Sequence, residues 1–248
     1  MVLIASLISM QDIVISQPWG GLGDNLQFST LPELYAARGH NVYISKDNVY
    51  RNPEIYDLVW KLNPFVKGIS DAPPNAGSCR GVEGTANYFL TNVEQAHGLP
   101  EGHRKYPVVY YTPKLIPGLE NCLLYDPTSI STNPSDANIE ATFQSIIDKH
   151  PDLKVKKIVF SRIGNRGLPS FNHSPYVIQT IYDMCDAIYS CKVFLTVFSG
   201  AAVLASALKQ DNPTPIIYSI HPPEQTSIGY KFHNEIYVPF VTPGSRPS

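Results

Sequence analysis

Short apolar runs alternate with amphipathic stretches along the 248 residues of the chain. Runs rich in Val, Ile and Tyr predict buried strands, and apolar residues at helical spacing predict helices. In the first part of the chain the expected strands are residues 13–15, 41–45, 65–69 and 107–111, and the expected helices are residues 26–40, 53–62 and 86–97. This alternation of strand and helix is typical of the βαβ units of a parallel sheet.

The same alternation begins again after a stretch with two prolines and a glycine, residues 112–120, which we interpret as a linker. The expected strands of the second part are residues 122–125, 157–161, 193–197 and 215–219, and the expected helices are residues 135–150, 177–189 and 201–209. The pattern therefore predicts an α/β protein with two Rossmann-like domains, residues 1–115 and 116–248, that face a shared cleft. In such sheets ligands bind outside the carboxyl ends of the strands.

Composition excludes some classes of function. The formal net charge is -2 and no basic stripe is visible, which argues against a nucleic-acid partner. The four cysteines form no Cys-x-x-Cys pair and have no zinc spacing, and we interpret them as reduced thiols of a cytoplasmic protein. The apolar start, residues 2–9, is too short to span a bilayer, and no other segment approaches that length. A peripheral contact with a membrane is left open.

A glycine-rich turn, Gly20-Gly21-Leu22-Gly23, follows the first apolar run and precedes a predicted helix. Glycine lets the backbone turn sharply and lets another molecule approach it closely. The start of the next helix offers free N–H groups and a partial positive charge, which suit a phosphate. Asp24 stands at this junction, where it is either a cap of the helix or a carboxylate that faces a ligand.

The second part of the chain contains a similar turn, Ser199-Gly200, between a predicted strand and a helix rich in Ala and Leu. Arg162 and Arg166 lie in a glycine-containing loop directly after another strand, where cations suit phosphates. Glu224 follows the last expected strand, at the edge of the cleft, where a carboxylate is able to hold a sugar hydroxyl. No Asp-x-Asp motif and no Gly-x-Ser-x-Gly elbow is present.

The turn from Gly20 to Asp24, with Leu31-Pro32 after it, resembles the start of GT-B glycosyltransferases. Glycogen and starch synthases have a similar Gly-Gly-Leu-Gly-Asp turn, and the lipopolysaccharide heptosyltransferases, which use ADP-heptose, have Gly-Asp followed by Leu-Pro. Residues 187–208 are similar to the heptosyltransferase segment in which a strand ends in Asp-Ser/Thr-Gly. This chain has Phe198 in place of the Asp of that segment and Val203 in place of its His.

The resemblance implies a small GT-B enzyme that moves a sugar from a nucleotide-diphosphate sugar to a hydroxyl acceptor, either a glycan or a lipid-linked sugar. It implies no bound metal and no other cofactor. The Asp that matches Asp24 is the general base in the heptosyltransferases, which implies the same role here. The expected substrate-binding residues are Gly21, Gly23, Asn25, Arg162, Arg166, Ser199, Gly200, Ala201 and Glu224.

Two alternatives stay open. The first is a noncatalytic nucleotide- or glycan-binding protein with a degenerate GT-B fold, which Phe198 and Val203 suggest. The second is an NAD-dependent oxidoreductase. It is disfavoured because such enzymes place an acidic residue at the end of the second strand, where this chain has Ser45-Lys46, with Asp47 slightly later.

Overall fold

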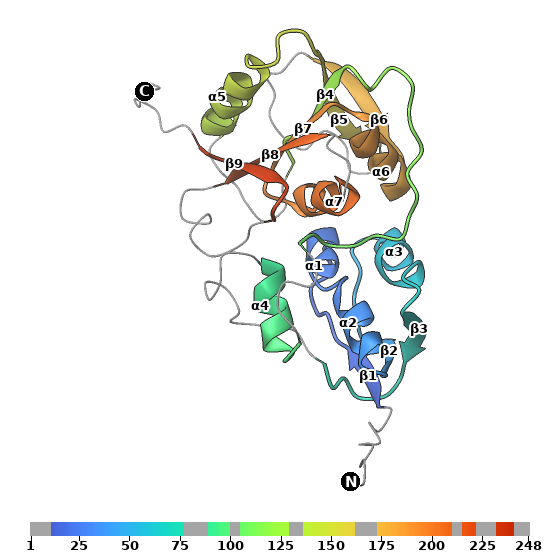
Figure 1. Ribbon diagram of the computed structural model, residues 1–248. Coiled ribbons are helices and arrows are strands. Elements are labelled where there is room, and N and C mark those ends of the chain that lie inside the picture. Colours follow the sequence, from blue (N-terminus) through green and yellow to red (C-terminus); the bar gives the residue numbers. More distant parts are fainter. Residues whose placement is uncertain are drawn as a thin grey trace, which may run out of the picture.

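The computed structural model describes residues 11–76, 89–99, 105–128, 136–161, 173–209, 215–221 and 232–240. Within these residues the chain forms two β-sheets, one of three strands and one of six. Figure 1 shows the three-stranded sheet in the lower part of the molecule and the six-stranded sheet in the upper part. We call them, with their helices, the smaller half and the larger half. The α/β class expected from the hydrophobic pattern is confirmed.

The smaller half contains a parallel sheet with the strand order β1-β2-β3. The strands are β1 (Asp12–Ile15), β2 (Asn41–Ser45) and β3 (Val66–Ser70). The helices are α1 (Leu22–Leu26), α2 (Leu31–Ala37), α3 (Pro53–Tyr56), the π-helix η1 (Asp57–Lys61) and α4 (Phe89–Ala96). The last three residues of β1 are buried, which explains its uninterrupted apolar run.

The larger half contains a parallel sheet with the order β6-β5-β4-β7-β8-β9. Its strands are β4 (Cys122–Asp126), β5 (Lys154–Phe160), β6 (Ser174–Ile178), β7 (Val193–Val197), β8 (Ile216–His221) and β9 (Glu235–Pro239). Its helices are α5 (Asp136–Ile147), α6 (Ile181–Ser190) and α7 (Gly200–Lys209). This is the doubly wound Rossmann order, in which the chain reverses its direction of growth between β4 and β7.

The larger sheet is covered on both faces, because successive residues of a strand point to opposite sides. Leu123 and Tyr125 of β4 pack in a cluster with α5, whereas Cys122 and Leu124 pack in the cluster that contains α6 and α7. The second cluster continues into the smaller half, where it includes Leu26 of α1. One apolar core therefore runs through the junction of the two halves.

Polar contacts also join the halves. Glu54 of α3 accepts a hydrogen bond from the backbone N–H of Ile181, at the start of α6, at 2.9 Å. Asp186 of α6 accepts two more from the segment before β4, one from the Tyr111 hydroxyl at 2.9 Å and one from the Lys114 backbone N–H at 2.8 Å. These contacts hold α6 against both α3 and the connecting segment.

The helix expected at residues 26–40 is wrong in its extent. The structure has two short helices instead, α1 and α2, separated by a turn at residues 27–30. Pro32 occupies the first turn of α2. Proline lacks a backbone N–H and has a fixed φ, so it suits the start of a helix and not its interior. The Leu31-Pro32 pair therefore marks a new helix.

The strand pattern is also corrected. The helix expected at 177–189 starts only at Ile181, because residues 174–178 form β6, and the edge strand β9 was not expected at all. Residues 107–111 form no strand. Both missed strands lie at sheet edges and contain a proline, Pro175 or Pro239. Edge strands tolerate proline because one side of the strand makes no ladder bonds. The domain boundary near residue 115 stays a prediction.

Among the described residues, no helix is long and apolar enough to cross a membrane.

Candidate functional site

The glycine-rich turn is held in place by buried amide side chains. Gln17 is fully buried, accepts a hydrogen bond from the Trp19 N–H at 2.9 Å and donates one to the Asp24 carbonyl at 3.0 Å. The backbone N–H of Gln17 donates to the Asn48 side chain at 2.8 Å. The loop after β2 therefore supports the turn after β1, and the conformation of residues 17–24 is fixed by side chains that the apolar pattern does not reveal.

Asn25 belongs to the same scaffold. Its side-chain nitrogen donates to the carbonyl of Gly21 at 2.8 Å and to that of Trp19 at 3.3 Å. Its side-chain oxygen accepts a hydrogen bond from the Trp60 indole at 2.8 Å. The residue has 0% exposure. The amide of Asn25 thus binds the protein itself, so contact with a substrate would need this network to open.

Asp24 is the third residue of α1 and its side chain turns back to the helix start. One carboxyl oxygen accepts a hydrogen bond from the Gly21 N–H at 3.1 Å. Burial raises the pKa of Asp24, while the Gly21 N–H and the nearby Arg51 guanidinium oppose that rise. The capping role and the functional role are therefore compatible, because the second oxygen is not used by the cap. Arg51 is an exposed cation beside Asp24 that the sequence analysis did not single out.

The glycines of the two turns serve close packing. Among the described residues the glycines with positive φ are Gly39, Gly68, Gly98 and Gly118, and none of these lies in either turn. A methyl group added to Gly23 would lie 3.1 Å from the Gly200 Cα, and one added to Gly200 would lie 2.9 Å from the Gly23 nitrogen. The helices α1 and α7 therefore meet backbone to backbone. The close approach expected at these glycines is made here by the protein itself: Gly23 and Gly200 approach each other, and Gly20 lies against the backbone of Val49 and Arg51.

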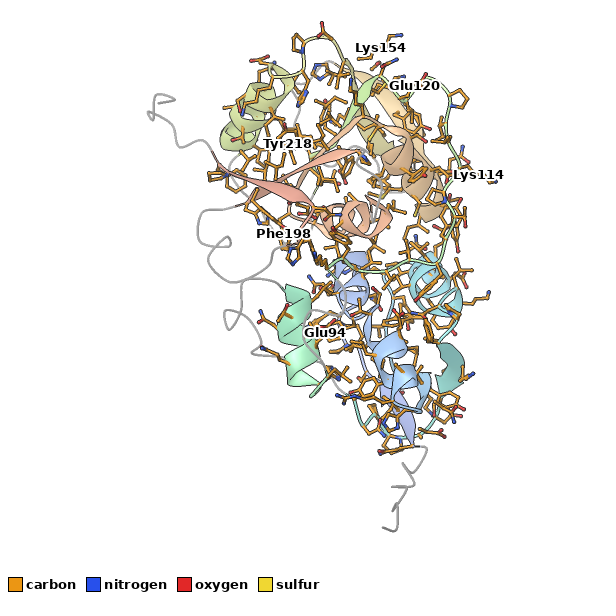
Figure 2. The ribbon with its side chains drawn as sticks, in the orientation of Figure 1. Glu94, Lys114, Glu120, Lys154, Phe198 and Tyr218 are labelled. Carbon is orange, nitrogen blue, oxygen red and sulfur yellow. The ribbon has the colours of Figure 1, made fainter. Side chains whose placement is uncertain are left out.

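The second turn begins where β7 ends. The Ser199 hydroxyl accepts a hydrogen bond from the Ala201 N–H at 3.2 Å, so Ser199 caps α7. The Phe198 N–H donates to the Ile220 carbonyl of β8 at 2.9 Å. The Phe198 ring lies on His221, the last residue of β8, with ring centroids 4.5 Å apart. Figure 2 shows Phe198 at the edge of the larger half, on the side of the smaller half and of Glu94 from α4.

Asp126, the last residue of β4, and Thr128 lie at the point where the strand order reverses. Asp126 is 2% exposed, and one of its oxygens accepts hydrogen bonds from the Thr128 N–H at 2.9 Å and the Thr128 hydroxyl at 2.5 Å. Burial raises the pKa of Asp126 to about 6. The sequence analysis did not single out Asp126. Its signal was an acidic residue directly after a fully apolar run, at a position where ligands bind in this topology.

The structure thus brings the two predicted turns together. Gly21, Gly23, Asp24 and Asn25 lie on one side of the contact between α1 and α7, and Ser199, Gly200 and Ala201 lie on the other. Arg162, Arg166 and Glu224 lie outside the described residues. The described cysteines, Cys122, Cys185 and Cys191, are free thiols and buried.

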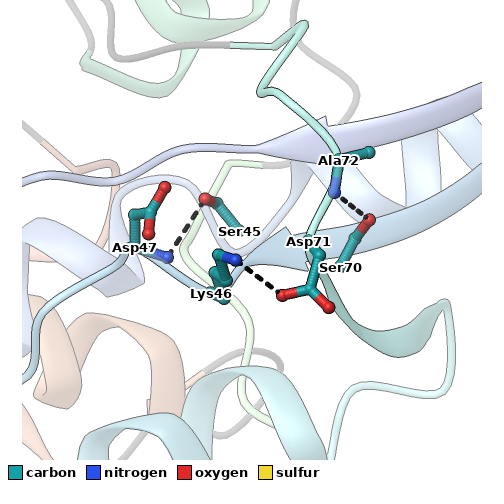
Figure 3. A network of polar contacts seen from close by, with 6 residues as sticks. All are labelled: Ser45, Lys46, Asp47, Ser70, Asp71 and Ala72. Atoms are coloured by element: carbon teal, nitrogen blue, oxygen red, sulfur yellow. Dashed lines mark hydrogen bonds and ion pairs between the residues drawn. The ribbon is translucent and has the colours of Figure 1, made fainter.

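The carboxyl ends of β2 and β3 form a separate polar network (Figure 3). Lys46 makes an ion pair with Asp71 at 2.9 Å, and the Ser45 hydroxyl accepts a hydrogen bond from the Asp47 N–H at 3.3 Å. β2 therefore ends in Ser45 and Lys46, and Asp47 is the first acidic residue after the strand.

Comparison with known proteins identifies the fold. No protein-family model and no curated protein sequence matches the chain. Among solved structures, it is similar to the iron-containing dodecameric glycosyltransferase TibC of enterotoxigenic E. coli, with a TM-score of 0.61 and 15% identity over 95% of this chain and 64% of TibC. The chain has the heptosyltransferase fold.

Two further structures support this assignment. A family 9 glycosyl transferase of Veillonella parvula matches with a TM-score of 0.57 and 9% identity over 92% of this chain and 85% of its own. The E. coli heptosyltransferase WaaC, solved with ADP, matches with a TM-score of 0.54 and 10% identity over 93% of each chain. The GT-B architecture expected from the resemblance is therefore confirmed as a fold.

TibC is longer than this chain and is described as iron-containing. The chain spans 64% of the length of TibC. Among the described residues, no group of three His, Cys, Asp or Glu side chains is placed to hold a metal ion. The residues described therefore do not fit an iron site.

Proposed function

We propose that the protein transfers a sugar from a nucleotide-diphosphate sugar to a hydroxyl acceptor, without a bound metal, and that Asp24 is the general base. The observation that carries the proposal is the position of Asp24. Its carboxyl group has a raised pKa and lies on α1, which touches the first residue of α7 in the other half. In a doubly wound sheet, the start of a helix after a strand is where phosphates bind.

The proposed sugar transfer requires a base for the acceptor hydroxyl and groups that stabilise the leaving diphosphate. Asp24 takes the proton of the acceptor hydroxyl as that oxygen attacks the anomeric carbon. The bond from this carbon to the diphosphate breaks, and the nucleoside diphosphate leaves with the electron pair. We propose that the start of α7, near Ser199 and Gly200, stabilises the developing negative charge through its partial positive charge. We assign the same purpose to Arg162 and Arg166, and binding of a sugar or ribose hydroxyl to Glu224.

The comparisons support the class of donor. TibC was solved with ADP-D-beta-D-heptose and WaaC with ADP, so proteins of this fold bind nucleotide-diphosphate sugars and nucleotides. For this chain we propose the same class of donor, with a glycan or lipid-linked sugar as the acceptor. The network at the ends of β2 and β3 argues against the oxidoreductase alternative, because Lys46 and Asp71 occupy that edge as an ion pair.

One observation favours a noncatalytic sugar-nucleotide binding protein as the second candidate. The heptosyltransferase segment that this chain resembles has an Asp where this chain has Phe198 and a His where it has Val203. Here the Phe198 ring packs on His221, and Val203 lies beside Gly23, where it contributes to the contact of the two halves. Both positions serve packing in this chain.

The substitution Asp24→Asn separates the two candidates. We expect transfer or hydrolysis of the nucleotide sugar to fall by roughly 10²–10⁴-fold, because the base is lost, while the affinity for the nucleotide sugar changes little. The assay compares UDP-, GDP-, ADP- and CMP-sugars by product release and by thermal shift. Since the pKa of Asp24 is raised, the wild-type rate also declines on acidification at a higher pH than an ordinary aspartate would give.

The matched control is Asp57→Asn, which removes a carboxylate from the exposed ion pair with Lys61 on η1. It is expected to keep wild-type turnover. Equal turnover of Asp24→Asn and wild type would remove the base assignment. Binding of nucleotide sugars without any turnover by the wild type would favour the noncatalytic candidate, and stabilisation by NAD alone would contradict both.

A further inference from the structure

Arg51 lies in the segment between β2 and α3, and this segment packs against the glycine-rich turn. The backbone N–H of Arg51 donates a hydrogen bond to the Gly20 carbonyl at 2.9 Å. A methyl group added to Gly20 would lie 3.1 Å from both the Arg51 nitrogen and the Val49 carbonyl oxygen, so the two backbones are in close contact. The backbone of Arg51 is therefore held against the turn that leads to Asp24.

The residues on both sides of Arg51 are fixed as well. Before it, the Asn48 side chain accepts a hydrogen bond from the Gln17 backbone N–H at 2.8 Å. After it, Asn52 caps α3, because its side chain accepts a hydrogen bond from the Glu54 N–H at 3.0 Å. The segment therefore presents the Arg51 side chain from a backbone that already has its hydrogen-bond partners.

The side chains of Arg51 and Asp24 face the same space, which is left open by the missing side chain of Gly21. A methyl group added to Gly21 would overlap with Oδ2 of Asp24 and would lie 3.6 Å from Nη1 of Arg51. Among the described residues, no ion pair joins the two side chains. The Arg51 side chain is exposed, and its guanidinium makes no hydrogen bond to a described residue. The cation thus lies near the carboxyl group without occupying its oxygens.

Arg51 is also the charged neighbour that matters for Asp24 among the described residues. The residues of α7 that meet α1, Gly200 and Val203, are uncharged, and so are the amide side chains that support the turn. Burial raises the pKa of Asp24, and the Gly21 N–H and the Arg51 guanidinium oppose that rise. Without Arg51, the N–H of Gly21 alone would favour the charged form.

We propose that Arg51 is a positioning residue for the reaction: its guanidinium keeps the Asp24 carboxyl group charged and turned to the space over Gly21, where the acceptor hydroxyl loses its proton. This inference rests on the proposed function, in which Asp24 is the base. A carboxyl group acts as a base only while it is ionised, and a nearby cation favours the ionised form. A direct ion pair would instead engage an oxygen that the hydroxyl needs. Gly21 keeps the two groups close while the space between them stays open.

A carbon-13 NMR titration of the side-chain carboxyl groups tests the inference without any substrate. The signal of Asp24 is the one that is missing in Asp24→Asn. In Arg51→Gln we expect its titration midpoint to rise by up to about one pH unit, because the loss of the cation disfavours the charged form. Arg51→Lys keeps the positive charge, so most of this rise should be absent. The control is Arg38→Gln, which removes an exposed cation at the end of α2 and should leave the midpoint unchanged.

The pH dependence of nucleotide-sugar turnover gives the functional readout. The rate of hydrolysis or transfer is measured with UDP-, GDP-, ADP- and CMP-sugars for the wild type, Arg51→Gln, Arg51→Lys and Arg38→Gln. In Arg51→Gln the decline on acidification should begin at a higher pH, so the rate on the acidic side falls by up to about tenfold. As the pH rises, the rate should recover toward that of the wild type, because Asp24 is then ionised without help. A merely structural role of Arg51 would lower the rate at every pH.

Equal titration midpoints of Asp24 in the wild type and in Arg51→Gln would overturn the inference and leave the proposed function intact. A rate that falls by the same factor at every pH would also overturn it, because Arg51 would then act on the substrate or on the fold and not on the charge of Asp24. A wild-type protein that turns over none of the nucleotide sugars contradicts the proposed function itself. In that case the NMR midpoints still decide whether Arg51 sets the charge of Asp24.

Discussion

Asn25 is the residue on which the conformation of the glycine-rich turn depends. It follows Asp24 directly in the chain, and neighbouring residues of a helix point in directions about 100° apart. Asp24 therefore remains at the surface of α1 while Asn25 points inward, to Trp60. The sequence predicts that both are polar and lie at one turn. It does not say which one is buried, because that depends on Trp60, 35 positions later.

Replacing Asn25 by Ala is expected to destabilise the protein by about 2–3 kcal/mol, since it leaves the buried Trp60 indole N–H without its partner and removes the side-chain hydrogen bonds to the carbonyls of Gly21 and Trp19. Urea unfolding followed by tryptophan fluorescence measures the loss. Asn41→Ala is the control, because its side-chain bond to Asp12 is exposed and its removal should cost less than about 0.5 kcal/mol. A similar small loss in both variants would show that the network does not hold the turn.

The contact of α1 with α7 is the main feature at the scale of elements. The two helices carry the two turns that the sequence singled out, one in each half of the chain. Sequence reasoning placed both turns at the carboxyl ends of strands, which the structure confirms for β1 and β7. It could not reveal that Gly23 and Gly200 touch, because no local pattern records a contact between residues so far apart in the chain.

The substitution Gly200→Ala tests the contact of α1 with α7, because helix propensity and packing predict opposite changes in stability. On helix propensity alone, alanine would stabilise α7 by up to about 1 kcal/mol. The structure predicts the opposite, a loss of about 1–3 kcal/mol, because the new methyl group would lie 2.9 Å from the Gly23 nitrogen. Gly23→Ala should act in the same direction but less strongly, since its nearest atom is 3.1 Å away. Thermal unfolding measures the stability of both variants. A Gly200→Ala protein that is more stable than the wild type would contradict the close contact of α1 with α7.

At the scale of the whole molecule, the sequence predicts the α/β class, two βα halves and most of the strands. It fails for β6 and β9, whose prolines and edge positions weaken the strand signal. It also fails for the polar residues inside the larger half. Asp126 and Glu235 are buried at ends of strands, where a pattern of apolar residues gives no warning of a carboxyl group without solvent.

Glu235 makes the stability of the whole molecule depend on pH. Burial raises its pKa from 4.5 to about 8 in the folded protein, although Ser219 and Tyr237 beside it partly oppose the rise. The folded state therefore binds more protons than the unfolded state between these two values. The contribution of Glu235 to stability is therefore fully present below about pH 4.5. This contribution is lost as the pH rises to about 8.

We expect the free energy of unfolding to fall between pH 5 and 8 with a slope that approaches about 1.4 kcal/mol per pH unit. Asp126 adds to this slope at the acidic end, because its pKa is raised to about 6. In Glu235→Gln most of the decline should disappear, whereas Glu120→Gln, at an exposed site, should keep it. Urea midpoints measured across this pH range decide the matter, and an unchanged slope in Glu235→Gln contradicts the assignment.

The backbone contact between Gly23 and Gly200 has a consequence for how such a protein diverges. An interface made of interlocking side chains constrains every residue that takes part in it, and each substitution on one side demands a matching one on the other. Where two helices meet through main-chain atoms, as they do at Gly23 and Gly200, both contact positions must stay small. A larger side chain at either position would push the two halves apart, so their spacing depends on two residues that carry no side chain.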